Sequence, residues 1–286
     1  MTLAITGASG PLGRAATRFA LEAVDPKDLV LTTRNPEALA DLAGRGADVR
    51  RVDFNDPLTL AAAFKGVDRL VLISTDVIGR RLEQQRAAVR AAADAGVRQV
   101  VYTSVPEPVP GNPAVVVADH AGTEQALRDS GLRWTMLRNN LYAHMQVPVI
   151  QRAAAEGRLV TNSAPGATAY VSREDCAAVA AAVLTGGGHE DRAYDVTGPT
   201  ALTAADLAVL ASEIGGREVE LVHVDDEAYA AGLRAAGLPA PVADLVTTFG
   251  ASAREGFLST VSSAVSDLAG RQPTSLAEIV RAAPAA

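Results

Sequence analysis

Three glycines near the amino terminus have the spacing of a phosphate-binding turn. Gly7, Gly10 and Gly13 form a G-x-x-G-x-x-G pattern between the apolar segment 3–6 and a helix-like stretch. Gly7 suits a tight turn, and Gly13 suits close packing of helix on strand. An ordinary strand-to-helix turn is the alternative, but backbone N–H groups at a helix N-terminus here favour a pyrophosphate and hence a dinucleotide. The predicted contacts are Gly7, Ser9, Gly10, Pro11, Leu12 and Gly13.

The residues after the second predicted strand indicate which dinucleotide is bound. An acidic side chain there would bind the ribose hydroxyls of NAD, but the segment 31–35 has no carboxylate and carries Arg34 instead. A guanidinium at this place can bind a 2′-phosphate and stack on adenine, or simply be solvated at a helix start. Arg34 therefore favours NADPH without excluding NADH.

Residues after the following strands are candidates for contacts with the rest of the cofactor. Asp53 and Phe54 are placed to contact the adenine, and Ser74 and Thr75 to run beneath the nicotinamide ribose. At the end of the fifth strand a tyrosine either packs against the nicotinamide edge or fills the strand. That strand end supplies the remaining candidates, Tyr102, Thr103 and Ser104.

The tyrosine–lysine pair that many short-chain dehydrogenases use is absent from the sequence. In that pair, a lysine four residues after the tyrosine lowers the pKa of the phenol, which exchanges a proton with the substrate oxygen. None of the five tyrosines has lysine at that spacing, and Lys27 and Lys65 are the only lysines. Reduction of simple ketones is therefore disfavoured. Either the chain binds the cofactor without catalysis, or its acceptor is a quinone-like ring that mainly needs alignment with the nicotinamide.

Side chains near the ends of the fifth and sixth strands are candidates for acting on a substrate. His120 could donate to a substrate oxygen or belong to a helix start, and Phe249 could form core or a lid over the pocket. The proline-rich loop 106–113 would border the site or be a surface connection. The catalytic candidates are His120, Asn139 and Tyr142; the substrate-binding candidates are Val105, Asn140, Tyr142 and Phe249.

Alternating strands and helices must position these residues. Short apolar runs between helical segments predict parallel strands and an α/β fold, a Rossmann-type doubly wound sheet with a smaller, mainly helical C-terminal substrate lobe. The cofactor domain is expected over 1–140, with a return to the sheet near 192–197, and the lobe over 141–286. Strands are predicted at 2–6, 29–32, 48–52, 69–73, 99–103 and 133–137, and helices at 12–24, 36–43, 57–64, 81–95, 118–130, 143–156, 173–184, 204–214 and 226–236.

Composition restricts the partners. A net charge of −7 with no basic stripe argues against a nucleic-acid surface, and no segment is apolar enough to cross a membrane. The histidines lack metal-ligand spacing and Cys176 is the single cysteine, so no metal site is expected. We expect a cytoplasmic protein, monomer or homodimer, with a small aromatic or quinone substrate.

Taken together, the motifs resemble those of the NmrA-like atypical short-chain dehydrogenases, and most closely the type 2 NAD(P)H:quinone oxidoreductases, with triphenylmethane reductase as a cousin. The resemblance runs nearly end to end and implies NADPH in the Rossmann domain and a quinone-like ligand between the two lobes. Two departures fall near the expected substrate cleft, Gln125 after the Thr-Glu pair and the run after Asn139. The segments that carry the resemblance are 5–13, 34–36, 72–74, 101–104, 118–120 with 123–124, 137–139 and 272–278.

Three functional hypotheses follow. The first is a reductase that passes hydride from NADPH to a quinone or polycyclic aromatic quinone. The second is a tailoring enzyme of aromatic polyketide biosynthesis, whose dihydroquinone product reacts with oxygen to give net monooxygenation; the alanine- and arginine-rich composition is its only associational support. The third is a non-catalytic regulator that senses NADP.

Overall fold

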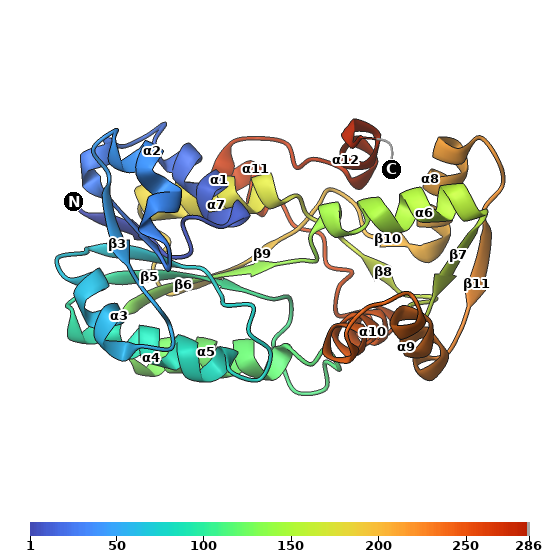
Figure 1. Ribbon diagram of the computed structural model, residues 1–286, viewed down its shortest axis with the longest axis horizontal. Coiled ribbons are helices and arrows are strands. Elements are labelled where there is room, and N and C mark those ends of the chain that lie inside the picture. The colour runs from blue at the N-terminus through green and yellow to red at the C-terminus, as the bar shows by residue number, and fades with distance from the viewer. Residues whose placement is uncertain (285–286) are drawn as a thin grey trace.

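A seven-stranded parallel sheet forms the centre of the computed structural model, which describes residues 1–284 (Figure 1). Its order, β3-β2-β1-β4-β5-β6-β9, reverses between β1 and β4, as in a doubly wound fold, and confirms the predicted fold class. The six strands expected in the first half are all present within two residues of their predicted bounds. The sheet consists of β1 (Leu3–Ile5), β2 (Leu29–Thr33), β3 (Asp48–Arg51), β4 (Arg69–Leu72), β5 (Gln99–Ser104), β6 (Arg133–Asn139) and β9 (Arg192–Val196).

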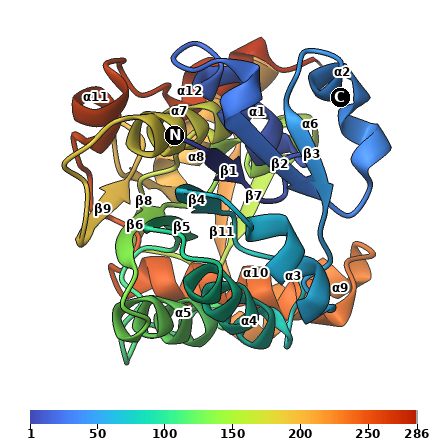
Figure 2. The same cartoon turned by 90° about the vertical axis from the view of Figure 1, so that its left-hand side faces the viewer.

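Helices cover both faces of this sheet (Figure 2). Alternate strand residues point to opposite sides, so that Ile5 and Val101 pack in one apolar cluster and Ala4 and Tyr102 in the other. Above the sheet lie α1 (Pro11–Ala20), α2 (Ala40–Ala43), α7 (Arg173–Thr185) and α11 (Ala264–Ala269). Below it lie α3 (Pro57–Phe64), α4 (Arg81–Asp94) and α5 (Val117–Asp129). Two short 3-10 helices, η1 (Pro26–Asp28) and η2 (Pro36–Leu39), flank β2 in the chain.

The second lobe is largely helical but contains two small sheets that the sequence did not indicate. Parallel β7 and β11 form one and antiparallel β8 and β10 the other. Helix α10 was also not predicted. The lobe contains η3 (Ala143–Met145), α6 (Val147–Glu156), β7 (Arg158–Thr161), β8 (Ala167–Thr168), β10 (Leu202–Thr203), α8 (Ala204–Gly215), β11 (Glu220–His223), α9 (Asp226–Ala235), α10 (Ala240–Arg254) and α12 (Leu276–Ala282).

Three helices differ from their predicted bounds for local reasons. The one predicted over 36–43 begins as the 3-10 turn η2 and becomes α-helical only from Ala40. Helix α1 ends at Ala20 instead of continuing to residue 24, because the backbone tightens to i→i−3 hydrogen bonds ahead of Pro26. Helix α6 begins at Val147, with Pro148 in its first turn, after the separate 3-10 turn of η3. Side chains cap two further helices: Ser275 and Glu278 form a capping box at α12, and Ser172 caps α7.

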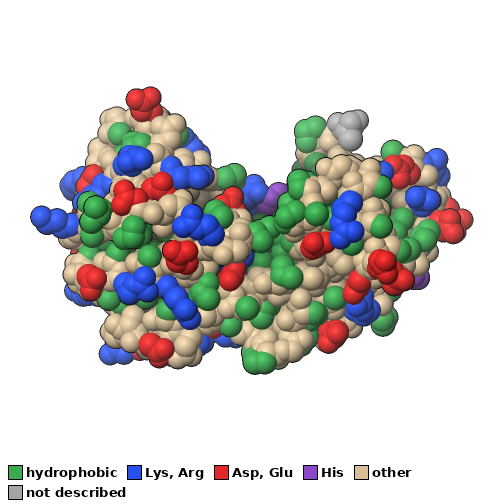
Figure 3. Space-filling model, turned by 60° about the horizontal axis from the view of Figure 1, so that its bottom comes forward, with side chains coloured by type: hydrophobic (Ala, Val, Ile, Leu, Met, Phe, Trp, Pro, Cys, Tyr) green, Lys and Arg blue, Asp and Glu red, His purple; other side chains and the backbone are tan. Residues whose placement is uncertain are grey.

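Several crossing segments join the two lobes. The N–H of Ala143 donates to the carbonyl of Val171 at 2.8 Å, and the N–H of Ala169 donates to the carbonyl of Leu258 at 2.9 Å. The space-filling view shows a hollow between the lobes, with hydrophobic side chains gathered at its floor (Figure 3). Within residues 1–284, no helix combines the length and hydropathy that crossing a membrane requires.

Candidate active site

The glycine turn forms a cradle between β1 and α1. Gly7 has a φ of +59°, and a Cβ added at Gly13 would collide with the Gly7 carbonyl oxygen and lie 2.7 Å from Ala8 Cα. Only glycine fits both positions, as the sequence predicted. Pro11 opens α1, and Leu12 is buried against the sheet. The hydroxyl of Ser9 shares a 2.7 Å hydrogen bond with Thr33, which fixes the turn to the end of β2.

Arg34 lies exposed at the carboxyl end of β2, beside Asp53 and half-buried Phe54 after β3. Hydrogen bonds from Asn55 lower the pKa of the Asp53 carboxyl, and the charges of Arg34 and Arg51 lower it further. The sequence analysis missed Arg51, which ends β3 opposite Thr33. Arg51 could have been found only from the register of β2 and β3, which places the last residues of the two strands side by side. Two guanidinium groups therefore lie near the Asp53 carboxylate at the carboxyl ends of β2 and β3.

Polar groups join the ends of β4 and β5. Thr103 Oγ1 accepts a hydrogen bond from the N–H of Ser74 at 2.9 Å, so these two candidates lie together at the carboxyl ends of neighbouring strands, next to the point between β1 and β4 where the strand order reverses. Thr75 is half-buried, and its hydroxyl has no hydrogen-bond partner among the described residues. The Thr75 carbonyl accepts a 2.6 Å hydrogen bond from Arg81 of α4. The loop after β4 is thereby attached to the helix beneath the sheet.

Tyr102 and His120 form a buried pair. The Tyr102 hydroxyl lies 2.7 Å from His120 Nδ1, and the two side chains are 0% and 4% exposed. Burial raises the pKa of Tyr102, and burial together with the charge of Arg81 lowers the pKa of His120 to about 3. Both side chains are therefore uncharged at neutral pH. Because Tyr102 faces the helices beneath the sheet, its phenol reaches a ligand only through His120.

Ser104 belongs to a buried ionic group around Glu124. Glu124 accepts hydrogen bonds from the Ser104 hydroxyl at 2.8 Å and from Arg138 at 2.9 and 3.0 Å. Arg128 donates a further bond at 2.8 Å. Burial opposes the carboxylate, but the donors from Arg138 and Ser104 outweigh it and lower the pKa of Glu124. The Ser104 hydroxyl thus ties the end of β5 to α5 and β6.

The two asparagines after β6 have different environments. Asn139 is 7% exposed, and the contact its amide makes with the Tyr142 phenol, which works against the rise in the phenol's pKa, falls short of ordinary hydrogen-bond geometry. Asn140 is fully engaged, donating to the carbonyl of Leu258 at 2.9 Å and accepting from the N–H of Leu141 at 2.8 Å. Asn139 therefore has hydrogen-bonding capacity left for a ligand, whereas the amide of Asn140 holds the crossing between the lobes.

Tyr142 lies half-buried next to His144 and Arg173. Its ring stacks on His144 with centroids 5.5 Å apart, and the Arg173 guanidinium lies 6.0 Å from the ring centroid. Burial raises the pKa of Tyr142, which keeps the phenol neutral at physiological pH. Val105 and Phe249, the two apolar substrate candidates, have a different environment. Both pack on a small buried cluster formed by Ala114, Val116 and Val117.

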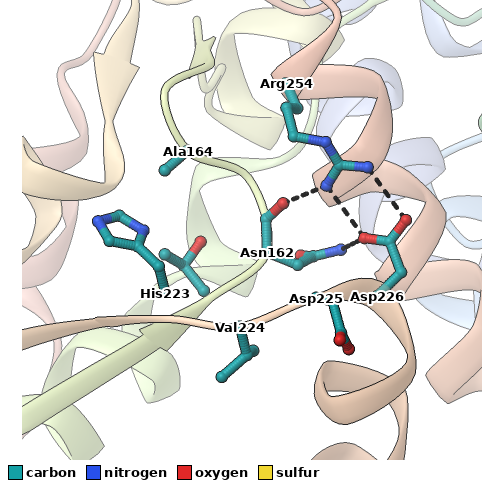
Figure 4. Close-up of a pocket in the computed structure, with 8 residues that line it drawn as sticks. Asn162, Ala164, His223, Val224, Asp225, Asp226 and Arg254 are labelled. Atoms are coloured by element: carbon teal, nitrogen blue, oxygen red, sulfur yellow. Dashed lines mark hydrogen bonds and ion pairs between the residues drawn. The ribbon is translucent and has the colours of Figure 1, made fainter.

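Helix α10, which carries Phe249, is held from its other side by a polar clasp, defined here as Asn162, Asp226 and Arg254 (Figure 4). Arg254 donates to both carboxylate oxygens of Asp226 at 3.0 Å, and the Asn162 amide donates to Asp226 at 2.7 Å and to the Thr247 carbonyl at 2.9 Å. A cavity of about 340 Å³ adjoins the clasp. Since these polar groups already bind one another, we assign the clasp to positioning α10.

Both lysines lie at the amino ends of the strands, on the opposite side of the sheet from the cradle at the carboxyl ends. Lys27 precedes β2 and Lys65 precedes β4, so each is near the amino end of a strand. In a parallel sheet, ligands bind beyond the carboxyl ends. Neither lysine can therefore assist a tyrosine at the site. Across residues 1–284, no three His, Cys, Asp or Glu side chains are grouped as a metal site would require.

Comparison with known proteins agrees with this geometry. The family model described as NAD(P)H-binding matches residues 7–186. Quinone oxidoreductase 2 of Escherichia coli is 34% identical over 278 residues, covering 97% of each chain, and its NADPH complex superimposes with a TM-score of 0.93 over 98% of this chain and 99% of that chain.

Two further relatives are similar along their whole length. The NAD(P)H azoreductase of Xenophilus azovorans is 30% identical, covering 99% of this chain and 98% of its own. The triphenylmethane reductase of Citrobacter sp. complexed with NADP(H) has a TM-score of 0.90 at 33% identity, over 98% of this chain and 99% of that chain. The chain therefore belongs to the NAD(P)H-binding family of Rossmann-fold oxidoreductases.

Proposed function

We propose that this protein is an NADPH-dependent reductase that delivers hydride to a quinone-like aromatic acceptor. The observation that carries the proposal is a complete dinucleotide cradle combined with no lysine at the ligand-binding edge of the sheet. The relatives named for quinone reduction and for NADPH or NADP(H) binding support it. The choice of NADPH is supported by Arg34 and Arg51 at the ends of β2 and β3, since β2 ends without a carboxylate, although the Asp53 carboxylate lies within reach of both charges.

The residues of the site fit this chemistry. The bound cofactor supplies the hydride. The cradle would hold the pyrophosphate at the α1 N-terminus, and the paired Ser74 and Thr103 position the loop on which the nicotinamide end would lie. The unpartnered amide of Asn139 has a donor and an acceptor to offer the nicotinamide carboxamide. These contacts would align the reacting atoms without a charged acid.

A quinone suits this site because its reduction gives an aromatic ring and needs little proton assistance. The wall that Val105 and Phe249 form offers an apolar surface for a flat ring and excludes water from it. Neutral donors, with His120 the first candidate, would stabilise the oxygen that gains charge. A polycyclic quinone would cover more of this wall than a simple quinone does.

The test is NADPH oxidation with quinones of graded ring size, with a simple ketone as the control acceptor. We expect quinones to accelerate oxidation and the ketone to leave it unchanged. If no quinone accelerates NADPH oxidation, the proposal is refuted, and tight cofactor binding without turnover would favour the NADP-sensing regulator instead. Performing the active reaction under ¹⁸O₂ distinguishes a plain reductase, whose product contains no label, from an enzyme whose dihydroquinone captures oxygen.

A further inference from the structure

The buried pair of Tyr102 and His120 has a defined direction. His120 is in the first turn of α5, and its Nδ1 faces the Tyr102 hydroxyl of β5 at 2.7 Å. His120 Nε2 forms no hydrogen bond with any residue from 1 to 284. A neutral imidazole has one donor and one acceptor nitrogen, so the bond made by Nδ1 decides what Nε2 can do.

Arg81 connects this pair to the loop after β4. Arg81 as a whole residue is 8% exposed. Its Nε donates to the Thr75 carbonyl at 2.6 Å, and its Nη1 lies 3.5 Å from the carboxylate of Asp119. Asp119 directly precedes His120 in α5. One guanidinium therefore joins the loop predicted to run under the nicotinamide ribose to the helix turn that carries the histidine.

We propose that Tyr102 and Arg81 are positioning residues that hold His120 in its Nε2-protonated neutral form, so that Nε2–H donates to the acceptor oxygen that becomes negative. This deepens the proposed function and rests on it. The Tyr102 hydroxyl donates to Nδ1, which leaves the ring proton on Nε2. The positive charge of Arg81 lies close enough to oppose a second proton on the ring.

The charged and titratable groups around His120 agree with this assignment. They come from three elements: Arg81 of α4, Tyr102 of β5, and Asp119 and Glu124 of α5. Asp119 already faces Arg81, and Glu124 is bound to Arg138 and Arg128. No free carboxylate among them is left to favour the imidazolium. The pKa of His120, lowered by burial and by Arg81 to about 3, is consistent with a ring that stays neutral.

The reaction balances with a neutral histidine. A quinone that receives a hydride gains two electrons and one proton and becomes a hydroquinone monoanion, and the cofactor is oxidised. His120 donates a hydrogen bond to the charged oxygen and keeps its proton. The second proton comes from water. The neutral histidine thus stabilises the developing charge by hydrogen bonding alone. Its effect does not vary with pH, whereas that of a general acid would fall as the acid loses its proton.

The test reads the histidine directly. Long-range ¹H–¹⁵N NMR of the imidazole rings distinguishes the two neutral tautomers from the cation, and a His120→Gln variant identifies the His120 signals among the four histidines. In the wild-type protein we expect the Nε2–H tautomer with no titration between about pH 5 and 8. In Tyr102→Phe we expect the tautomers to mix and kcat for quinone reduction to fall by at least about tenfold, with KM for NADPH within about twofold.

A matched control exists in the same chain. His189 Nδ1 lies 3.1 Å from the Tyr194 hydroxyl, at the β9 edge of the sheet away from the cradle. Tyr194→Phe removes the same hydroxyl from an equivalent pair and should leave kcat within about twofold. Arg81→Gln should raise the pKa of His120 only in part, because burial is the larger cause of its lowering, and Arg81→Lys should reverse that rise.

Two results would overturn the assignment: a wild-type His120 protonated on Nδ1 or titrating near pH 6.5, or a Tyr102→Phe variant that matches Tyr194→Phe in tautomer and kcat. The NMR result is independent of turnover. A wild-type protein with the expected tautomer but no quinone-dependent NADPH oxidation would therefore refute the proposed function, whereas an active enzyme with the wrong tautomer would refute only the role of His120.

Discussion

Replacing Glu124 by glutamine removes a buried negative charge but keeps the shape of the side chain. The carboxylate is 2% exposed, and one of its oxygens accepts from Ser104 and Arg138 while the other accepts from Arg128 and Arg138. A glutamine can keep one oxygen in place, so its NH₂ group must face guanidinium donors at the other. Two charge-assisted hydrogen bonds are then lost.

Each such bond contributes about 1.5 kcal/mol, and the partial exposure of Arg128 and Arg138 reduces the sum to about 2–3 kcal/mol of unfolding free energy. The assay is equilibrium denaturation of both proteins at pH 7, with the slope of the transition unchanged. Glu213→Gln is the control, because Glu213 pairs with Arg281 at the same 2.8 Å but with side chains 54% and 59% exposed. It should cost at most about 0.5 kcal/mol.

The difference between wild type and Glu124→Gln should also depend on pH. Because the folded pKa of Glu124 is lowered below its ordinary value of 4.5, the contribution of the carboxylate is complete above that value and is lost as the pH falls through the lower folded pKa. The two stabilities should therefore converge in acid. Equal losses from Glu124→Gln and Glu213→Gln at pH 7, or a difference that grows in acid, would refute the reasoning.

Three more predictions concern the cofactor cradle and the substrate wall. Arg34→Ala should raise KM for NADPH by about tenfold or more and leave KM for NADH within about twofold; equal losses would speak against a 2′-phosphate contact. Gly13→Ala should abolish tight NADPH binding in calorimetry because the added methyl meets backbone atoms, whereas Gly187→Ala, with nothing within 4 Å, should bind normally. Arg254→Gln loosens the clasp, so it should raise KM for bulky quinones more than for small ones, and an identical change for both would show that α10 does not shape the site.

The sequence was sufficient for the sheet and the cradle because both depend on local rules. Strand alternation, proline at a helix start and glycine at a tight turn are properties of a few neighbouring residues, and Gly7, Gly13 and Pro11 occupy the conformations that these rules require. The caps that Ser172 and Ser275 form are local in the same way, since each side chain accepts from a backbone N–H three residues on.

Long-range pairing could not be read in the same way. The sequence placed Tyr102 on a strand but could not tell which face its ring would take, and the ring lies under the sheet against His120. Arg81 stands in a run of polar residues that is typical of a solvated helix start, yet tertiary packing buries it. Arg51 becomes a candidate only once β3 is placed beside β2.

The order in which the chain is synthesised matters because the sheet is completed late. Residues 1–140 contain six of the seven central strands, but β9 (Arg192–Val196), which covers the edge of β6, and α7 (Arg173–Thr185), which covers the face shared with α1, come from later in the chain. A nascent chain therefore carries an open strand edge and an uncovered apolar face until residue 196 has emerged. The sheet and the helices that cover it are therefore complete only after segments well beyond the sixth strand have been made.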